Sequence, residues 1–162
     1  MKIAFIGTGY VGLVSGVMMS HLGHEVTCLD IDHDKIKQLQ NKKSPIYESG
    51  LEEYIKRYAD TPKLKFASEY SENIKDADCV FVTVGTPPKE NGDANLDGIF
   101  NAIKSSIHYL KPECVVVIKS TVPPGTCSAI KQFLQENGKD FEVASNPEFL
   151  REGSAVEDFL NP

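Results

Sequence analysis

The feature that most restricts the fold of this chain is a series of short, continuously apolar segments. They occupy residues 3–6, 25–29, 64–67, 79–84, 114–119 and 141–144. Each is of strand length, and most are apolar throughout rather than at alternate positions. That pattern is typical of parallel strands that are covered on both faces of a sheet. The apolar segments therefore predict a buried parallel sheet.

The intervening segments have the spacing of helices. We expect helices over residues 11–22, 34–41, 51–59, 69–74, 97–110 and 126–136. Asp32 or His33 can cap the second of these and Asn95 or Asp97 the fifth, because short polar side chains accept from free amides at helix starts. Strands that alternate with helices predict an α/β fold: a doubly wound, mostly parallel Rossmann-type sheet with helices on both faces. Residues 1–162 suffice for one such domain.

Composition excludes several classes of function. The formal net charge of −6 argues against a nucleic-acid partner, because no basic surface offsets phosphate repulsion. The four cysteines show no C-x-x-C spacing, so we expect neither a disulfide framework nor a metal site. We expect instead that the protein is located in the reducing cytoplasm. No stretch has the features of a signal peptide or a membrane span, and we expect no membrane partner.

Three glycines follow the first predicted strand at the spacing G-x-G-x-x-G. Gly7 permits a tight turn, Gly9 lets the backbone approach a pyrophosphate, and Gly12 lets the next helix pack closely on the sheet. The free amides of that helix start would bind the phosphates. In this context the glycines predict a dinucleotide site.

An acidic residue, Asp30, ends the second predicted strand. Its carboxylate can accept hydrogen bonds from both ribose hydroxyls and would repel a 2′-phosphate, so we expect NAD rather than NADP. Lys35 is close enough in sequence to reach the ribose or the phosphates.

Polar segments follow the later strands, where ligands of open α/β sheets bind. Gly85, Thr86 and Pro87 follow the fourth strand, and Ser120 and Thr121 the fifth. Each could also be a plain turn. Residues 86–93 are rich in proline and polar side chains, so we expect a mobile loop beside the ligand.

Glu148 and Glu152 follow the sixth predicted strand. They would share a face if the segment were helical, although a solvated helix start would explain the pair equally simply. Glu148 is the better candidate for a general base, because desolvation just past a strand end can raise a carboxyl pKa. Thr121 is a poor base alone but could hold a water molecule.

Taken together, several motifs resemble the nucleotide-sugar dehydrogenases. They are IGTGYVGLVSG, VTCLDIDHDKI, PIYESGL, VFVTVGTPPKENGDANLD, KSTVPPGT and SNPEFLREGSAVEDFLNP, and they cover the chain in order. The wording of VGTPP and NPEFLREG favours members that act on UDP-glucose over those that act on UDP-N-acetylmannosamine or GDP-mannose. The resemblance implies two successive NAD-linked oxidations of the C6 alcohol of UDP-glucose to UDP-glucuronate, through intermediates covalently held on a cysteine.

The resemblance also implies roles for individual residues. Thr121 and Glu148 would be catalytic, with Glu148 in acid/base chemistry and activation of the hydrolytic water. The implied sugar site comprises Glu148, Phe149, Leu150 and Arg151. The implied NAD contacts are Gly7, Gly9, Tyr10, Val11, Gly12, Asp30, Lys35, Gly85, Thr86, Pro87, Ser120, Thr121 and Glu152, the last at the nicotinamide end.

The chain departs from that family in one respect. The nucleophilic cysteine of the family lies in a G-G-x-C-x-x-K-D type motif, and none of Cys28, Cys79, Cys114 and Cys127 has this setting. We therefore expect residues 1–162 to be the N-terminal NAD-binding domain of a longer enzyme, without its central helix and its C-terminal UDP-sugar-binding domain. This domain would bind NAD but not complete the reaction, and the longer enzyme would be a homodimer or a higher oligomer.

Two other interpretations use the same glycines and acid. A β-hydroxyacid or hydroxyacyl-CoA dehydrogenase would place its catalytic residues downstream, and a non-enzymatic nucleotide-sensing module would need no chemistry past the later strands. Neither explains KSTVPPGT or NPEFLREG.

Overall fold

Every strand of the sheet runs parallel to its neighbours. A computed structural model describes residues 1–162, and its strands are ordered β3-β2-β1-β4-β5-β6. The central register joins Ile3 of β1 to Val26 of β2 on one side and to Cys79 of β4 on the other. The strands are β1 (Lys2–Ile6), β2 (Glu25–Leu29), β3 (Leu64–Ala67), β4 (Cys79–Val82), β5 (Val115–Ile118) and β6 (Glu142–Ser145). The predicted doubly wound α/β fold is confirmed.

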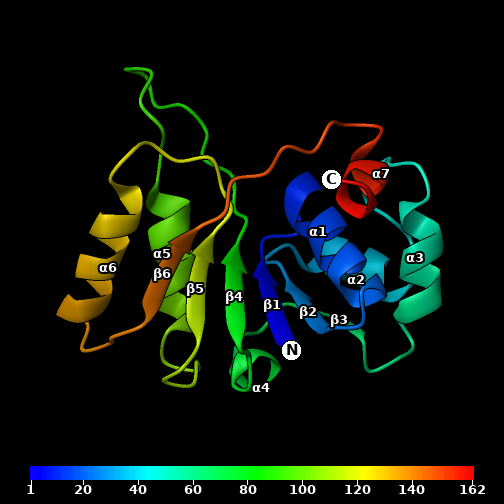
Figure 1. Cartoon of the computed structure of the whole chain (residues 1–162), viewed down its shortest axis with the longest axis horizontal. Coiled ribbons are helices and arrows are strands. Elements are labelled where there is room, and N and C mark those ends of the chain that lie inside the picture. The colour runs from blue at the N-terminus through cyan, green and yellow to red at the C-terminus, as the bar shows by residue number, and fades with distance from the viewer.

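Helices cover both faces of this sheet (Figure 1). One face carries α1 (Tyr10–His21), α2 (His33–Gln40), α3 (Leu51–Tyr58) and α7 (Ala155–Leu160). The other carries α4 (Ser71–Ile74), α5 (Asp97–Ser106) and α6 (Thr126–Glu136). None of the helices combines the length and the apolar composition that a membrane span requires.

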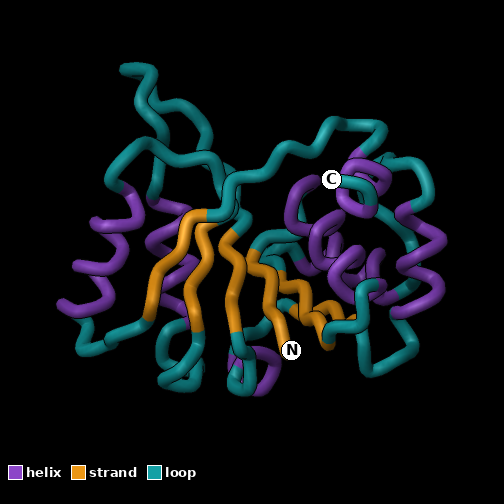
Figure 2. The backbone as a smooth tube through the Cα atoms, in the orientation of Figure 1, coloured by secondary structure: helices purple, strands orange, loops and turns teal.

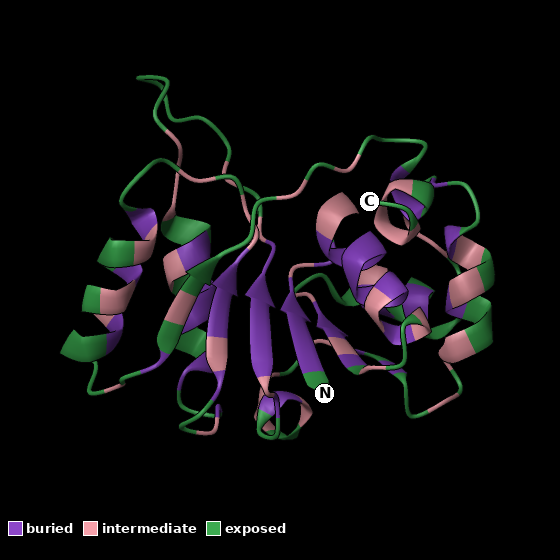
Figure 3. Cartoon of the chain, in the orientation of Figure 1, coloured by how far each residue is buried: buried purple, intermediate pink, exposed green.

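Alternate residues of each central strand enter different cores. Ile3 and Phe5 of β1 pack under α1, whereas Ala4 and Ile6 pack on the opposite side of the sheet. Phe5 stacks on Phe81 of β4, with ring centroids 4.8 Å apart. Figure 3 shows buried residues along the central strands and mostly exposed ones along β6. Burial on both faces explains why the central strands are apolar at consecutive positions.

The expected helices and strands are present, with shifts at several ends. The side chain of Asp32 accepts a hydrogen bond from the Lys35 amide at 3.0 Å and so caps α2 as predicted. At α5 the cap residue is Leu96, and Asn95 instead accepts from the Asp97 amide at 2.9 Å. The fifth helix ends at Ser106 rather than at residue 110, and the buried Ile107 and Leu110 extend the core from the turns that follow.

Glu148 and Glu152 do not share a helical face, because residues 146–151 form no helix. Residues 146–151 have no regular secondary structure; they leave β6 at the edge of the sheet and cross the carboxyl ends of the strands towards α1. The chain then forms α7, which packs on α1 and which the sequence did not predict. Figure 2 shows this connection as a loop over the sheet. We call residues 146–154 the crossing segment.

The turn after β1 lies unusually close to β4. A Cβ atom at Gly12 would lie 2.0 Å from the carbonyl oxygen of Gly7 and 2.4 Å from Oγ1 of Thr83. A Cβ at Gly7, where φ is 100°, would lie 2.8 Å from the carbonyl oxygen of Thr83. Only glycine fits at either position without displacing backbone atoms.

This contact predicts the effect of Gly12→Ala. Because the added methyl group meets backbone rather than a movable side chain, we expect a loss of about 1–3 kcal/mol in the free energy of unfolding, the usual range for overpacking. Urea denaturation of the variant measures it. Gly85→Ala is the matched control, since a Cβ there meets nothing within 4 Å, and equal midpoints for the two variants would contradict the prediction.

Candidate functional site

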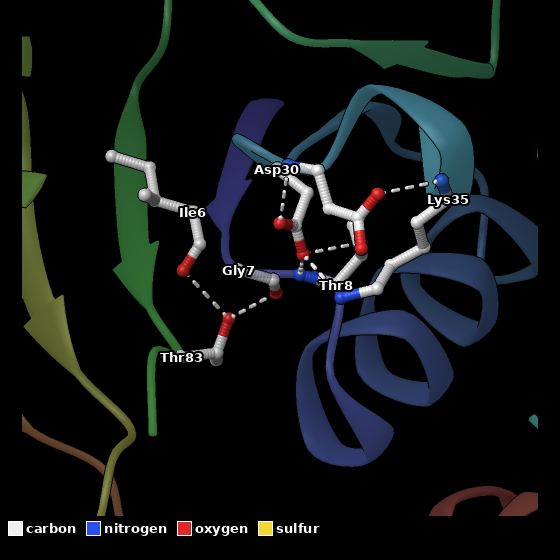
Figure 4. Close-up of polar contacts among 7 residues, drawn as sticks. Ile6, Gly7, Thr8, Asp30, Lys35 and Thr83 are labelled. Atoms are coloured by element: carbon white, nitrogen blue, oxygen red, sulfur yellow. Dashed lines mark hydrogen bonds and ion pairs between the residues drawn. The ribbon is translucent and has the colours of Figure 1, made fainter. Parts of the chain in front are cut away.

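Thr83 fixes the glycine turn from the end of β4. Its hydroxyl oxygen lies 3.0 Å from the carbonyl oxygen of Ile6 and 2.8 Å from that of Gly7, and it can donate to either (Figure 4). On the other side, the Gly7 amide donates to the carbonyl oxygen of Leu29 at 2.7 Å. Sequence reasoning missed Thr83, because its importance comes from a contact 76 residues away in the chain.

Gly9 leaves space where the helix begins. A Cβ at Gly9 would meet nothing within 4 Å, and no side chain caps the amides that start α1. A cavity of about 240 Å³ opens there, and we call it the turn cavity. Its lining residues are Gly9, Tyr10, Val11, Thr83, Val84, Gly85, Thr86, Lys119, Ser120, Thr121 and Glu148. Free amides at a helix start beside an open cavity can bind phosphate groups.

Asp30 lies beside the same turn, at the end of β2. Its Oδ2 accepts hydrogen bonds from the amide of Thr8 at 2.8 Å, from the Thr8 hydroxyl at 2.7 Å and from Nζ of Lys35 at 3.0 Å (Figure 4). Oδ1 accepts only from the Asp32 amide, at 3.1 Å, and so retains room to accept from a ribose hydroxyl. Burial raises the pKa of the Asp30 carboxyl, but the combined hydrogen bonds lower it below its ordinary value.

A second cavity, of about 290 Å³, lies on the α5 side of the glycine turn. Gly7, Asp30, Ile31 and Tyr70 line it, together with the part of α5 that contains Ala102. The Ile31 side chain is 81% exposed. An apolar cavity next to a carboxylate suits an adenosine group, with its base against Ile31 and its ribose at Asp30. Sequence reasoning missed Ile31, Tyr70 and Ala102, which come together only in the fold.

These observations test whether the residues fit a dinucleotide. The Asp30 carboxylate has a free acceptor site that suits the ribose, and the uncapped start of α1 suits the pyrophosphate. The two cavities beside the glycine turn leave room for the adenosine and the nicotinamide ends. The residues therefore fit NAD, with Asp30 for the ribose and Gly9, Tyr10 and Val11 for the phosphates.

The ends of β4 and β5 are tied together. The Thr86 hydroxyl donates to the carbonyl oxygen of Thr121 at 2.9 Å, and the Ser120 hydroxyl donates to that of Val84 at 2.6 Å. Pro87 lies outside the turn cavity and begins an excursion in which Pro88 and Ala94 form an antiparallel bridge. The structure thus shows a hairpin-like loop at residues 87–95, and its mobility stays a prediction.

Glu148 lines two cavities. Besides the turn cavity, it lines one of about 600 Å³ beneath the crossing segment, which we call the large cavity. Lys119 lines both as well, and its Nζ donates to Oδ1 of Asn146 at 3.2 Å. Burial lowers the pKa of the Lys119 ammonium group, while the nearby Glu148 opposes that shift. Sequence reasoning did not single out Lys119.

The other predicted sugar-site residues also line the large cavity. Phe149 is 90% exposed, Leu150 packs against the core under α1, and Arg151 pairs with Asp158 of α7 through Nη2 at 2.6 Å. The stacked Phe5 and Phe81 form part of the apolar wall. Glu152 is exposed and lines neither the turn cavity nor the large cavity, so its contact with nicotinamide stays a prediction.

No cysteine lines the turn cavity or the large cavity. Cys28, Cys79 and Cys114 are buried, and burial raises the pKa of the Cys28 and Cys114 thiols to about 12. Cys127 is half-buried near the start of α6. A buried thiol with a raised pKa, such as that of Cys28 or Cys114, carries little of the nucleophilic thiolate form.

Comparison with known proteins agrees with this geometry. Residues 1–162 match the model of the UDP-glucose/GDP-mannose dehydrogenase family, NAD binding domain. A UDP-glucose 6-dehydrogenase of Rickettsia conorii is 54% identical over 162 residues, which are 100% of this chain and 38% of that protein. The chain thus spans about two-fifths of the length of this relative.

Solved structures show the same domain. A UDP-glucose dehydrogenase from Pyrobaculum islandicum superposes with a TM-score of 0.91 at 37% identity, covering 99% of this chain and 39% of that one. A GDP-mannose dehydrogenase from Pseudomonas aeruginosa superposes with a TM-score of 0.87 at 38% identity, covering 98% of this chain and 38% of that one. Among the three interpretations left open by the sequence, the matches support the nucleotide-sugar dehydrogenases.

The hydrogen bonds at Asp30 predict a pH-dependent effect of Asp30→Asn on stability. Because the folded-state pKa of Asp30 is lowered, its ionised form stabilises the fold above the unfolded-state pKa of about 3.9, and this contribution is lost as the pH falls through the folded-state pKa. We expect the variant to unfold at a lower urea concentration than the wild type at pH 6, and the gap to narrow towards pH 3.

Asp34→Asn is the matched control, since Asp34 is exposed on the neighbouring helix and its replacement leaves the contacts with Thr8 and Lys35 in place. A gap between wild type and Asp30→Asn that stayed constant from pH 6 to pH 3 would contradict the prediction.

Proposed function

Since the chain belongs to the UDP-glucose/GDP-mannose dehydrogenase family as its NAD-binding domain, we propose that the whole protein oxidises the C6 alcohol of UDP-glucose to the carboxylate of UDP-glucuronate. The oxidation takes two NAD-dependent steps. Residues 1–162 supply the oxidant site and one acid/base group, and the rest of the protein supplies most of the nucleotide-sugar site and the covalent nucleophile.

The position of Glu148 carries this proposal. Glu148 lines both the turn cavity, where the helix start binds phosphate groups, and the large cavity, where Phe149, Leu150 and Arg151 lie. A carboxylate between an oxidant and an alcohol can accept the proton that the alcohol loses during oxidation. It can later activate the water that hydrolyses an acyl intermediate.

Each of the other residues has a defined task in the proposal. Asp30 binds the adenosine ribose, the amides after Gly9 bind the pyrophosphate, and Thr121 holds a water molecule or a polar group of the ligand beside Glu148. NAD bound in this site would supply the hydride acceptor that each oxidation requires. Lys119 is half-buried and lines both cavities, and its ammonium group stabilises the negative charge of the Glu148 carboxylate.

The relatives differ in the nucleotide sugar that their names give. The relative at 54% identity is named a UDP-glucose 6-dehydrogenase. The two solved structures, at 37% and 38% identity, are named a UDP-glucose dehydrogenase and a GDP-mannose dehydrogenase. We favour UDP-glucose because of the closer relative. Specificity constants of the full-length protein for UDP-glucose, UDP-N-acetylmannosamine and GDP-mannose would decide between them.

The role of Glu148 predicts the kinetics of Glu148→Gln in the full-length protein. We expect kcat to fall by about 10²–10⁴-fold, the usual contribution of a general acid/base, while the Kd for NAD changes less than about threefold. NADH absorbance measures the first and calorimetry the second. Glu157→Gln is the control, because Glu157 is exposed and lines neither of the cavities that Glu148 lines. A Glu148→Gln enzyme with wild-type kcat would refute the assignment.

The cysteines predict the behaviour of residues 1–162 alone. Because most of the proposed nucleotide-sugar site lies outside these residues and no thiol lines the turn cavity or the large cavity, we expect this chain to bind NAD but neither to hold UDP-glucose for oxidation nor to release NADH above the rate without protein. Calorimetry and NADH absorbance test the two halves. Steady turnover by the 162-residue chain would show that it holds a complete active site.

A further inference from the structure

Glu48 is buried in the loop between α2 and α3 without a basic partner. Only 6% of its surface is exposed, and no lysine, arginine or histidine forms an ion pair with it. Removing a carboxylate from water is costly unless its oxygens accept hydrogen bonds. The contacts that offset this cost therefore show what Glu48 holds in place.

The partners of Glu48 come from distant parts of the chain. Oε2 accepts hydrogen bonds from the hydroxyl of Tyr10 and from the amide of Gly153, the latter at 2.8 Å. Oε1 accepts from the amide of Val156 at 3.5 Å. The Tyr10 hydroxyl oxygen also lies 3.0 Å from the Gly153 nitrogen and 3.4 Å from the carbonyl oxygen of Arg151. We call Tyr10, Glu48 and Gly153 the clasp.

Two further observations indicate that the clasp is built for this contact. Gly153 has a φ of 86°, a left-handed conformation that favours glycine and that turns the chain just before α7. Burial and the hydrogen bond to Glu48 raise the pKa of Tyr10 to about 12. The Tyr10 hydroxyl consequently stays protonated, and donates to Glu48, across the range in which enzymes work.

The clasp joins the two halves of the candidate site. Tyr10 directly follows Gly9 and lines the turn cavity. Gly153 lies in the crossing segment, five residues after Glu148. On this stretch Leu150 packs against the core and Arg151 pairs with Asp158, so both anchors lie on the α1 side. Gly153 is thus one of the contacts that fix the course of the crossing segment beyond Glu148.

We propose that Glu48 is a positioning residue: through Tyr10 and the Gly153 amide, it holds the crossing segment so that Glu148 lies between the turn cavity and the large cavity. The proposal rests on the proposed function of Glu148. Glu48 lines neither of these cavities and acts through the backbone it binds.

The test compares four variants of the full-length protein. Glu48→Ala removes both acceptors, Glu48→Gln keeps one acceptor oxygen for Tyr10 and Gly153, and Tyr10→Phe removes the hydroxyl. Glu53→Ala is the matched control for Glu48→Ala, because Glu53 is exposed on the neighbouring helix. Tyr47→Phe, at a side chain that is 91% exposed, is measured alongside as the control for Tyr10→Phe.

The first readout is amide hydrogen exchange with NAD bound. In Glu48→Ala we expect exchange of residues 149–156 to rise at least tenfold while exchange in α3 and β1 stays at the wild-type rate, with a smaller rise in Glu48→Gln. A loss of protection spread over the whole domain would mean that Glu48 only stabilises the fold. Unchanged exchange at 149–156 would overturn the proposal outright.

The second readout separates kcat from cofactor binding. We expect Glu48→Ala to lower kcat per folded protein at least tenfold, while the Kd for NAD stays within threefold of the wild-type value. For Glu48→Gln we expect the decrease in log kcat to be no more than half of that in Glu48→Ala. If Glu48→Ala does not fold, Glu48→Gln and Tyr10→Phe decide by the same two readouts. An unchanged kcat in every clasp variant would refute the positioning role.

The two proposals fail differently. A wild-type protein that oxidises no nucleotide sugar would refute the proposed function. Amide hydrogen exchange at residues 149–156 in the Glu48 variants would still test whether the clasp holds the crossing segment. A wild-type enzyme whose Glu48→Gln and Glu48→Ala variants match it in both readouts would refute the clasp alone.

Discussion

The close contact between the turn after β1 and the end of β4 determines the geometry of the carboxyl edge. At Gly7 and Gly12 there is no space for a Cβ atom, and the Thr83 hydroxyl holds the carbonyl groups of the turn from below. Because the turn is pressed onto the sheet, the amides at the start of α1 face an open cavity rather than a neighbouring strand. Asp30 is positioned by the same turn, through both polar groups of Thr8.

The second constraint is the course of the chain after β6. In a doubly wound sheet the last strand lies at one edge, far from the central β1. The crossing segment spans this distance over the strand ends and is secured on the far side by α7 and the contacts of Glu48. One extended segment thereby forms a wall of the turn cavity and a wall of the large cavity, which is how a single carboxylate can line both.

Sequence patterns predicted the parts of this structure that local chemistry controls. Apolar runs located the strands, the glycine spacing located the turn, and the position of Asp30 at the end of the second strand identified it as the ribose-binding candidate. Thr83, Glu48 and Lys119 were missed because their roles arise from contacts with residues that are distant in the chain. The spacing of Glu148 and Glu152 left open whether their segment is helical. It is not, and its course depends on contacts with distant parts of the chain, which local spacing does not reveal.

The contact between residues 10 and 153 also affects the order in which the domain can be completed during synthesis. β1 and β2 can pair before β4 has been made, and the glycine turn gains its contact with Thr83 once β4 has emerged. The wall that carries Glu148 is secured only later, because its contact at Gly153 lies 143 residues after Tyr10 in the chain. The two walls of the turn cavity are thus completed at different times during synthesis, the one at the glycine turn first and the one that carries Glu148 last.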